Sequence, residues 1–278
     1  MSSEQDAFAK AAGALRPYLT ELVVVGGWAH RLFRLHPRAT APSFRPLATD
    51  DVDVATPLDL GSARPPIDTL LKAAGFEPEV RGDESPPVAR YVLGTAHEAF
   101  ELEFIADLRG SETKRRGRDA TALLAGISAQ KLRHVEVLLM NPWTVHLDAS
   151  VGYAVPGGPV DLRIPNPTAY LFQKVVTLPR RVLGGKQGKD VLYVFDTLHL
   201  FASSFDVLGD CWRTLSPTLT GKVQRQFAEL RARLFAADAD GVVAAAAIAR
   251  GTGRPSPPTP TVIAATCRAG FDAVFGSL

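Results

Sequence analysis

LVVVGGWAHRLF (Leu22–Phe33) and TDDVDV (Thr49–Val54) are the two stretches that decide the fold. In the first, an apolar strand runs through Gly26–Gly27 into a helix. In the second, Asp51 and Asp53 stand two residues apart on a predicted strand, so both carboxylates point to the same face. A glycine turn lets backbone N–H groups approach a phosphate, and paired carboxylates are ligands for a divalent cation. Together the two stretches predict a site for phosphoryl or nucleotidyl transfer.

A second acidic strand follows at Phe100–Ile105 (FELEFI). Its alternation places Phe100, Leu102 and Phe104 on one face and Glu101 and Glu103 on the other. Three carboxylates on adjacent strands can hold two magnesium ions about 3.5–4 Å apart, which suits a triphosphate substrate and a pyrophosphate leaving group.

The composition is that of an ordinary globular protein: among 278 residues, 46% are hydrophobic and 22% charged. The net charge of +2, from 31 basic and 29 acidic residues, is too balanced to indicate a nucleic-acid protein by itself, so any nucleic-acid contact must come from local clusters. Cys211 and Cys267 form neither a zinc motif nor a disulfide framework. Because no signal-peptide pattern and no apolar stretch of membrane-spanning length is present, we expect a soluble, cytoplasmic protein without a membrane partner.

The order of elements predicts an α+β protein of two domains, residues 1–165 and 166–278. The first domain would be a mixed sheet flanked by helices, with His36–Thr49 as a proline-containing loop. Further strands are predicted at Val135–Leu139, Val145–Leu147 and Val160–Ile164. From Pro167 onward, apolar residues recur at helical spacing, so the second domain is predicted to be helical.

These motifs resemble the nucleotidyltransferase superfamily of the DNA polymerase beta type. Within it, the chain is most similar to the AbiEii-like and MenT-like bacterial toxin nucleotidyltransferases. Gly26 and Gly27 match the family's glycine motif, and Asp51 and Asp53 match its Asp-x-Asp motif. The resemblance implies a third carboxylate on the next acidic strand, placed on Glu103.

Glu101 is the alternative third carboxylate, and the choice between the two stays open at this stage. In the helical half, PTAYLFQKVVTLPRR resembles the family helix whose lysine, here Lys174, lies near the nucleotide phosphates. GKQGKDVLYVFDTLHL resembles the next family helix, which opens with a Lys-Asp pair, here Lys189 and Asp190. A lysine beside the transferring phosphates supplies positive charge where negative charge accumulates.

The resemblance implies a Mg²⁺-dependent enzyme that moves NMP from an NTP to a hydroxyl acceptor, a tRNA 3′ end or a protein. It further implies the toxin of a toxin–antitoxin system, with an antitoxin protein as partner. Two alternatives remain: a catalytically weak member that binds a nucleotide or a partner, and an aminoglycoside-type nucleotidyltransferase. The first is motivated by Glu103, since the family usually has aspartate there. A basic run at Lys114–Arg118 could contact RNA phosphates.

Overall fold

The computed structural model describes residues 3–40, 42, 44–47, 49, 51–61, 64–81, 88–95, 99–108, 120–181 and 185–276. The chain divides into two compact units. The sheet unit comprises residues 1–35 and 48–165, and the helical unit comprises residues 36–47 and 166–278.

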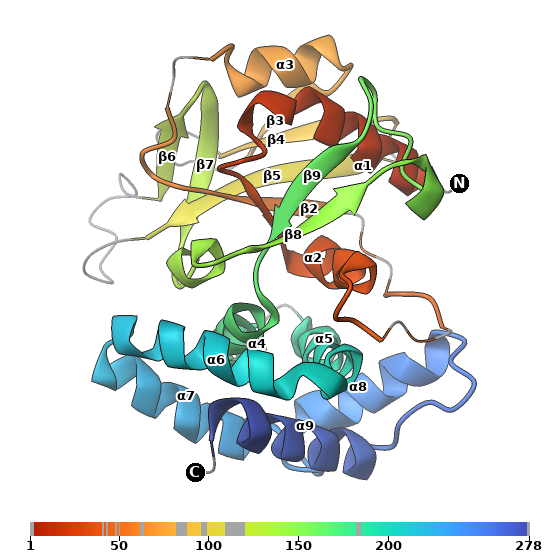
Figure 1. Cartoon of the computed structure of the whole chain (residues 1–278), viewed down its shortest axis with the longest axis vertical. Helices are drawn as coiled ribbons and strands as arrows, with labels where there is room; N and C mark the ends of the chain where they lie inside the picture. The colour runs from red at the N-terminus through yellow and green to blue at the C-terminus, as the bar shows by residue number, and fades with distance from the viewer. Residues whose placement is uncertain are drawn as a thin grey trace. The chain divides into compact units, whose positions relative to one another are not determined.

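The sheet unit is built on a mixed seven-stranded sheet (Figure 1), with β1, β2, β5, β4 and β3 in that spatial order. β7 pairs with β5 beside β4, and β6 pairs with β7. β2 and β7 run parallel to β5, while the other pairs are antiparallel. The strands are β1 (Val23–Val25), β2 (Asp51–Thr56), β3 (Glu77–Arg81), β4 (Val88–Leu93), β5 (Phe100–Asp107), β6 (Thr121–Leu124) and β7 (Ile127–Leu132).

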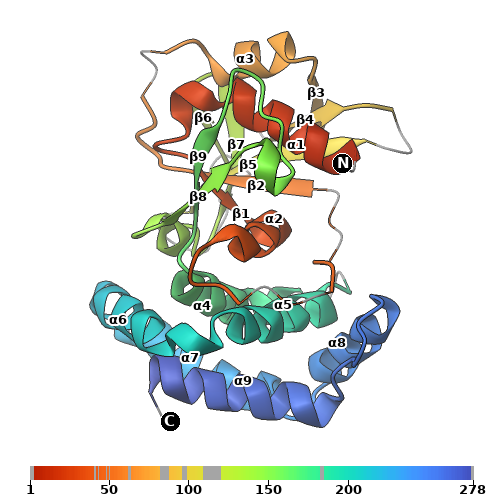
Figure 2. The ribbon, with the colours of Figure 1, turned by 45° about the vertical axis from the view of Figure 1, so that its right-hand side comes forward.

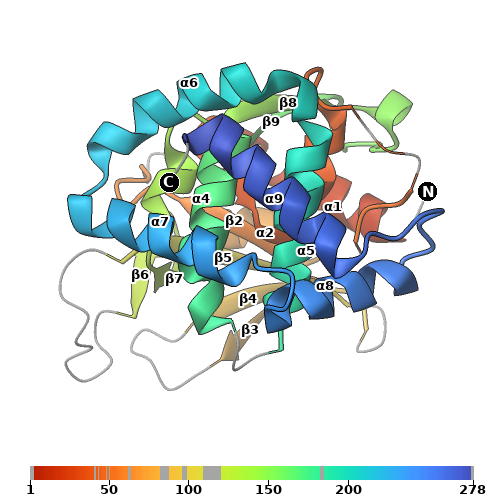
Figure 3. The same ribbon diagram turned by 90° about the horizontal axis from the view of Figure 1, so that it is seen from below.

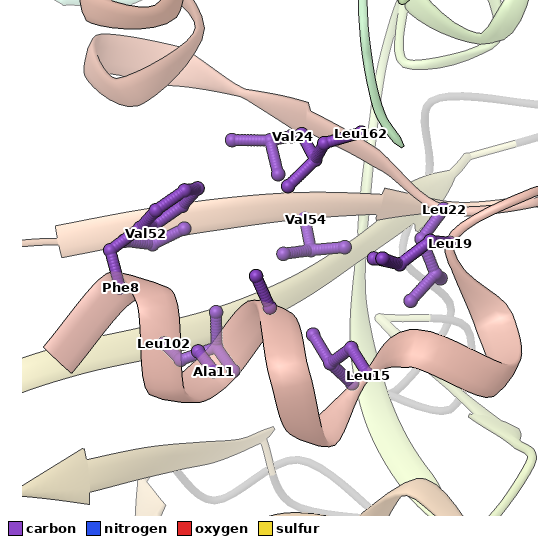
Figure 4. Close-up of a pocket in the computed structure, with 11 residues that line it drawn as sticks. Phe8, Ala11, Leu15, Leu19, Leu22, Val24, Val52, Val54, Leu102 and Leu162 are labelled. Carbon is purple, nitrogen blue, oxygen red and sulfur yellow. The ribbon is translucent and has the colours of Figure 1, made fainter. Parts of the chain in front are cut away.

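One face of this sheet is sealed by apolar side chains. Helix α1 (Ser3–Ala14) lies along it, and Figure 4 shows Phe8 of α1 and Leu15, directly after α1, against Val52 and Val54 of β2. All eleven residues that line the small pocket there are apolar. The rings of Phe8 and Trp28 stack in the same core, 4.1 Å apart. Because strand side chains alternate, the acidic residues of β2 and β5 emerge on the opposite face.

The sheet unit also contains two further helices, two further strands and a 3-10 turn. β8 and β9 form a separate antiparallel hairpin (Figure 2), in agreement with the two strands predicted near these positions. The elements are α2 (Gly26–Leu32), α3 (Ile67–Ala73), β8 (Trp143–Leu147), β9 (Val160–Ile164) and the 3-10 turn Glu136–Leu139.

Two local features of the sheet unit were not predicted correctly. The prediction of a strand at Val135–Leu139 is wrong, because the segment forms a 3-10 turn. An apolar run this short does not show whether its hydrophobic residues repeat with the period of a strand or of a helix. The β6–β7 hairpin was not predicted. Its two-residue turn, Ala125–Gly126, has positive φ at both positions, which is the geometry that Asn-Gly usually signals. Because alanine occupies the first position of this turn, the sequence lacks the Asn-Gly pair that usually predicts it.

The helical unit contains six α-helices among its described residues (Figure 3). Helix α9 packs against α5, α6, α7 and α8. A cluster of aromatic rings fills the unit, with Phe227 and Phe275 4.8 Å apart. The helices are α4 (Pro167–Thr177), α5 (Gln187–Leu200), α6 (Phe205–Leu215), α7 (Gly221–Leu234), α8 (Asp240–Gly251) and α9 (Pro260–Phe275).

The segment His36–Leu47 belongs to the helical unit, although the predicted boundary placed it in the first domain. Two contacts explain its assignment. The backbone N–H of Thr40 donates to the carbonyl of Leu200 at 2.8 Å. The ring of Phe44 lies under the guanidinium of Arg254, 4.1 Å from ring centroid to Cζ. The chain therefore enters the helical unit between the glycine motif and the Asp-x-Asp strand, and enters it again after Pro165.

In the described part of the chain, no single helix has the length and hydropathy of a membrane span. Gln187–Leu200 and Ala202–Thr218, bent by 62°, reach those limits only when taken together.

Candidate functional site

The turn between β1 and α2 requires glycine at its first position. Gly26 has φ +65°, in the left-handed region, and α2 begins directly there. A Cβ added to Gly26 would lie 2.4 Å from Oδ2 of Asp53. Gly27 continues α2 without a positive φ. The glycine motif therefore does more than turn the chain, because it leaves room for the carboxylate of the Asp-x-Asp strand.

Asp51 and Asp53 emerge on the polar face of β2. Val52 and Val54 between and after them are fully buried on the other face, as predicted, while both aspartates are half-buried. The hydroxyl of Thr49 donates to Oδ1 of Asp51 at 2.6 Å. The sequence motif includes Thr49, but its role in orienting Asp51 was not recognised. Asp50 lies outside the described residues.

The register between β2 and β5 places two acidic pairs side by side. Asp53 stands directly across from Glu103, and Asp51 from Glu101. Neighbouring strands are about 4.8 Å apart, so four carboxylates share a small area of one sheet face. Like charges directly opposite one another on adjacent strands destabilise a sheet. A cation between two opposed carboxylates would reduce their mutual repulsion.

Arg90 on β4 brings positive charge to the same face. It stands across from Glu103 in the β4–β5 register. Its Nη1 forms an ion pair with Oε1 of Glu101, and its Nε donates to Oε2 of Glu79 at 2.8 Å. Sequence reasoning missed Arg90. Alternation along β4 could have indicated it, because Tyr91 beside it is buried on the apolar face.

The donor set on this face fits magnesium in its chemistry. Magnesium prefers oxygen ligands and is commonly held by one or two carboxylates together with substrate phosphates. Asp51, Asp53 and Glu103 would be the protein ligands, and the bare Cα of Gly26 leaves space beside Asp53. In the described residues, no three His, Cys, Asp or Glu side chains are arranged to hold an ion by themselves.

The helical unit contains the predicted lysine in a buried ion-pair network. Lys174 on α4 is 5% exposed, and its Nζ donates to Oδ1 of Asp190 at 2.7 Å. Nε of Arg181 donates to Oδ2 of the same carboxylate at 2.7 Å. Burial, the largest influence, raises the pKa of Asp190, but the charges and hydrogen bonds of Lys174 and Arg181 outweigh it and lower this pKa overall.

Asp190 is therefore an ionised partner of two cations. The role of Lys174 beside the phosphates stays a prediction, because Lys174 and the sheet carboxylates belong to different units. Lys189 is half-buried, and its Nζ lies 5.9 Å from the ring centroid of Tyr193. The basic run Lys114–Arg118 lies outside the described residues.

A nucleotidyltransferase family model matches residues 6–217. The chain belongs to this nucleotidyltransferase family. The match includes the whole acidic face, the glycine turn and α4 to α6 of the helical unit. The matched region begins before the glycine motif and ends after the last motif in the helical half. Helices α7, α8 and α9 lie outside the matched region. Membership supports a transferase activity, and the identity of a toxin subfamily is not part of this match.

A comparison with solved structures found similarity to an antigenic nucleotidyltransferase-like protein from Paracoccidioides brasiliensis. The two chains share 18% sequence identity, with a TM-score of 0.40. The similarity covers 71% of this chain and 76% of the other. No curated protein matches the sequence.

Proposed function

We propose that this nucleotidyltransferase moves a nucleoside monophosphate from an NTP to a hydroxyl acceptor and releases pyrophosphate. The observation that carries the proposal is the register of β2 and β5, which sets Asp53 across from Glu103 with Asp51 on the same face. Gly26 adds to it, since its missing side chain is what admits the Asp53 carboxylate.

In this reaction, the acceptor hydroxyl loses its proton to water and its oxygen forms a bond to the α-phosphorus, while the bond from that phosphorus to the bridging oxygen of pyrophosphate breaks. Magnesium, when bound, neutralises the triphosphate and the developing charge on the leaving group. Asp51, Asp53 and Glu103 would hold the cations, and the Thr49 hydroxyl donates a hydrogen bond that orients Oδ1 of Asp51. The backbone at Gly26 lies close enough to Asp53 to bring the β1–α2 turn and the cation site together.

The acceptor that we propose is a nucleic acid or protein hydroxyl, a tRNA 3′ end being the leading candidate. Support for it is the resemblance of the motifs to toxin nucleotidyltransferases, and the same resemblance supports an antitoxin as partner. A small-molecule acceptor is the alternative that uses the same glycine and aspartate motifs.

The proposal is tested by incubating the purified chain with each α-labelled NTP, Mg²⁺ and either total RNA or total protein. We expect label on one acceptor class, and a loss of roughly 10²–10³-fold in rate for Asp53→Asn, because cation ligation contributes several kcal/mol to the transition state. Asp59→Asn is the matched control, since Asp59 is exposed shortly after β2. It should keep the wild-type rate.

No label transfer to RNA or protein from any NTP would overturn the proposed acceptor. Full activity in Asp53→Asn would overturn the proposed site. NTP binding in calorimetry without any turnover would instead indicate a nucleotide-binding protein of the same fold.

A further inference from the structure

Lys174, Asp190 and Arg181 form an ion-pair network in the helical unit, and this network lies in a stretch rich in positive charge. Residues 174–190 include five basic residues and one acidic residue, whereas the whole chain has 31 and 29. The stretch covers the end of α4, the 3-10 turn Leu178–Arg180 and the start of α5. All of it belongs to the helical unit. A local excess of positive charge in a chain of balanced charge attracts anions.

Lys174 is the enclosed cation of this network. Its side chain is 6% exposed, and its Nζ donates to Oδ1 of Asp190 at 2.7 Å. The ring centroids of Tyr170 and Tyr193 lie 5.5 and 5.2 Å from Nζ, so a carboxylate and two aromatic rings surround the ammonium group. The Asp190 side chain is 2% exposed, so its charge needs this partner. A Lys174 side chain that turned toward a solute would leave a buried carboxylate with less compensation.

Arg181 is the accessible cation of the same network. Its Nε donates to Oδ2 of Asp190 at 2.7 Å, while its side chain is 41% exposed. The bond to Asp190 restricts the rotation of the guanidinium, and the exposure lets a solute reach it. A planar guanidinium matches the oxygens of a phosphate group, which it can bind through two parallel hydrogen bonds. Arg181 thus combines a fixed orientation with access from solvent, whereas Lys174 has only the first.

Two further lysines lie close to Arg181. The backbone N–H of Lys186 donates to the carbonyl of Arg181 at 3.3 Å, and Lys186 is exposed. Lys189 is half-buried, and its Nζ lies 5.9 Å from the ring centroid of Tyr193, the ring that also flanks Lys174. These three cations are thus all more accessible than Lys174.

We propose that Arg181, and not Lys174, is the residue of this network that binds a phosphate group of the substrate. Lys174 and Asp190 are positioning residues, because the lysine compensates the buried carboxylate and the carboxylate orients the guanidinium. The inference rests on the proposed function and specifies which cation of the helical unit meets the substrate's phosphates. The phosphate belongs either to the NTP or to the backbone of a nucleic-acid acceptor, and both present the same oxygens to Arg181.

The experiment is a calorimetric titration of the full chain with inorganic tripolyphosphate, with each of the four NTPs and with a short single-stranded RNA. Arg181→Gln should weaken tripolyphosphate binding about fivefold or more, because a charge-assisted contact is lost. Arg181→Lys keeps the charge without the planar fork and should lose less. Arg180→Gln is the matched control, since it removes one positive charge from the exposed neighbouring residue. It should change the affinity less than twofold.

The NTP and RNA titrations identify the source of the phosphate. Weaker binding of NTPs alone in Arg181→Gln supports the inference and assigns the phosphate to the donor nucleotide. Weaker binding of RNA alone supports it and assigns the phosphate to the acceptor.

Lys174→Met tests the positioning role. It should lower the free energy of unfolding in urea, while the folded variant binds tripolyphosphate within twofold of wild type. If the variant does not fold, acetylation of the wild-type chain, followed by mass spectrometry, gives the same information. Lys186 and Lys189 should be acetylated, and tripolyphosphate should protect them. Lys174 should stay unmodified with or without tripolyphosphate.

Four results would overturn the inference: no binding of tripolyphosphate by wild type, unchanged affinity in Arg181→Gln, equal losses in Arg180→Gln and Arg181→Gln, or acetylation of Lys174 that tripolyphosphate prevents. Equal losses at positions 180 and 181 would mean that net charge alone attracts the ligand. The proposed function fails separately. Tripolyphosphate binding through Arg181 without any label transfer from an NTP would overturn the function and retain the site, whereas label transfer with unchanged binding in Arg181→Gln would do the reverse.

Discussion

Asp53 on β2 and Asp196 on α5 are both carboxylates inside a folded unit, but their surroundings differ in kind. Asp53 is half-buried and stands across from another acid, Glu103. Asp196 is 2% exposed and accepts hydrogen bonds from both Nη atoms of Arg254, each at 2.6 Å. The first arrangement leaves like charges facing one another, whereas the second compensates each charge fully.

The difference shows how carboxylates with a role in binding or catalysis can be distinguished from carboxylates that stabilise the fold. A buried ion pair with two hydrogen bonds is satisfied within the protein, so removal of one partner leaves a costly unpaired charge. A group of like charges on one sheet face is instead unfavourable until a cation arrives. The nucleotidyltransferase family match over residues 6–217 includes both strands of the acidic face.

The largest effect that would test this comparison concerns Arg254. Arg254→Ala leaves the Asp196 carboxylate buried without its bidentate partner and removes the guanidinium from the Phe44 ring. We expect the free energy of unfolding in urea to fall by about 3–5 kcal/mol. Arg213→Ala is the control, because its ion pair with Asp210 is exposed. It should cause no measurable change, and equal effects of the two variants would contradict the distinction.

A smaller effect concerns how the free energy of unfolding depends on pH below pH 5. The pKa of Asp190 is lowered in the folded chain, so its ionised form stabilises the fold above the unfolded-state pKa, about 4. That contribution disappears as the pH falls through the lower folded pKa. Asp190→Asn should therefore be less stable than wild type at pH 7, and its stability should decline less between pH 5 and pH 2. A steeper decline in the variant would show that Asp190 is not held ionised.

Sequence patterns were sufficient for much of the fold. Alternation in TDDVDV and FELEFI placed Asp51, Asp53, Glu101 and Glu103 on one face, as the register confirms. The change to helices after Pro165 was also correct, because amphipathic spacing is local information. The turn at Ala125–Gly126 was missed, since alanine rarely adopts the required positive φ.

Partnerships across long sequence separations could not be predicted. Asp196 and Arg254 are 58 residues apart, and Lys174 and Asp190 lie on different helices. The choice of Glu101 by Arg90 depends on side-chain orientation, because the register alone sets Arg90 across from Glu103. These pairings follow from tertiary packing, for which a single sequence contains no periodic signal.

The central claim is that the acidic face binds a divalent cation and that Asp53 is one of its ligands. Its most direct test is the urea unfolding of wild type and Asp53→Asn, in metal-free buffer and in saturating Mg²⁺. In Mg²⁺, wild type should gain about 2.7 kcal/mol at a hundredfold excess over Kd, and Asp53→Asn should gain much less. No Mg²⁺ effect on wild type, or an equal gain for Asp53→Asn, would contradict the claim.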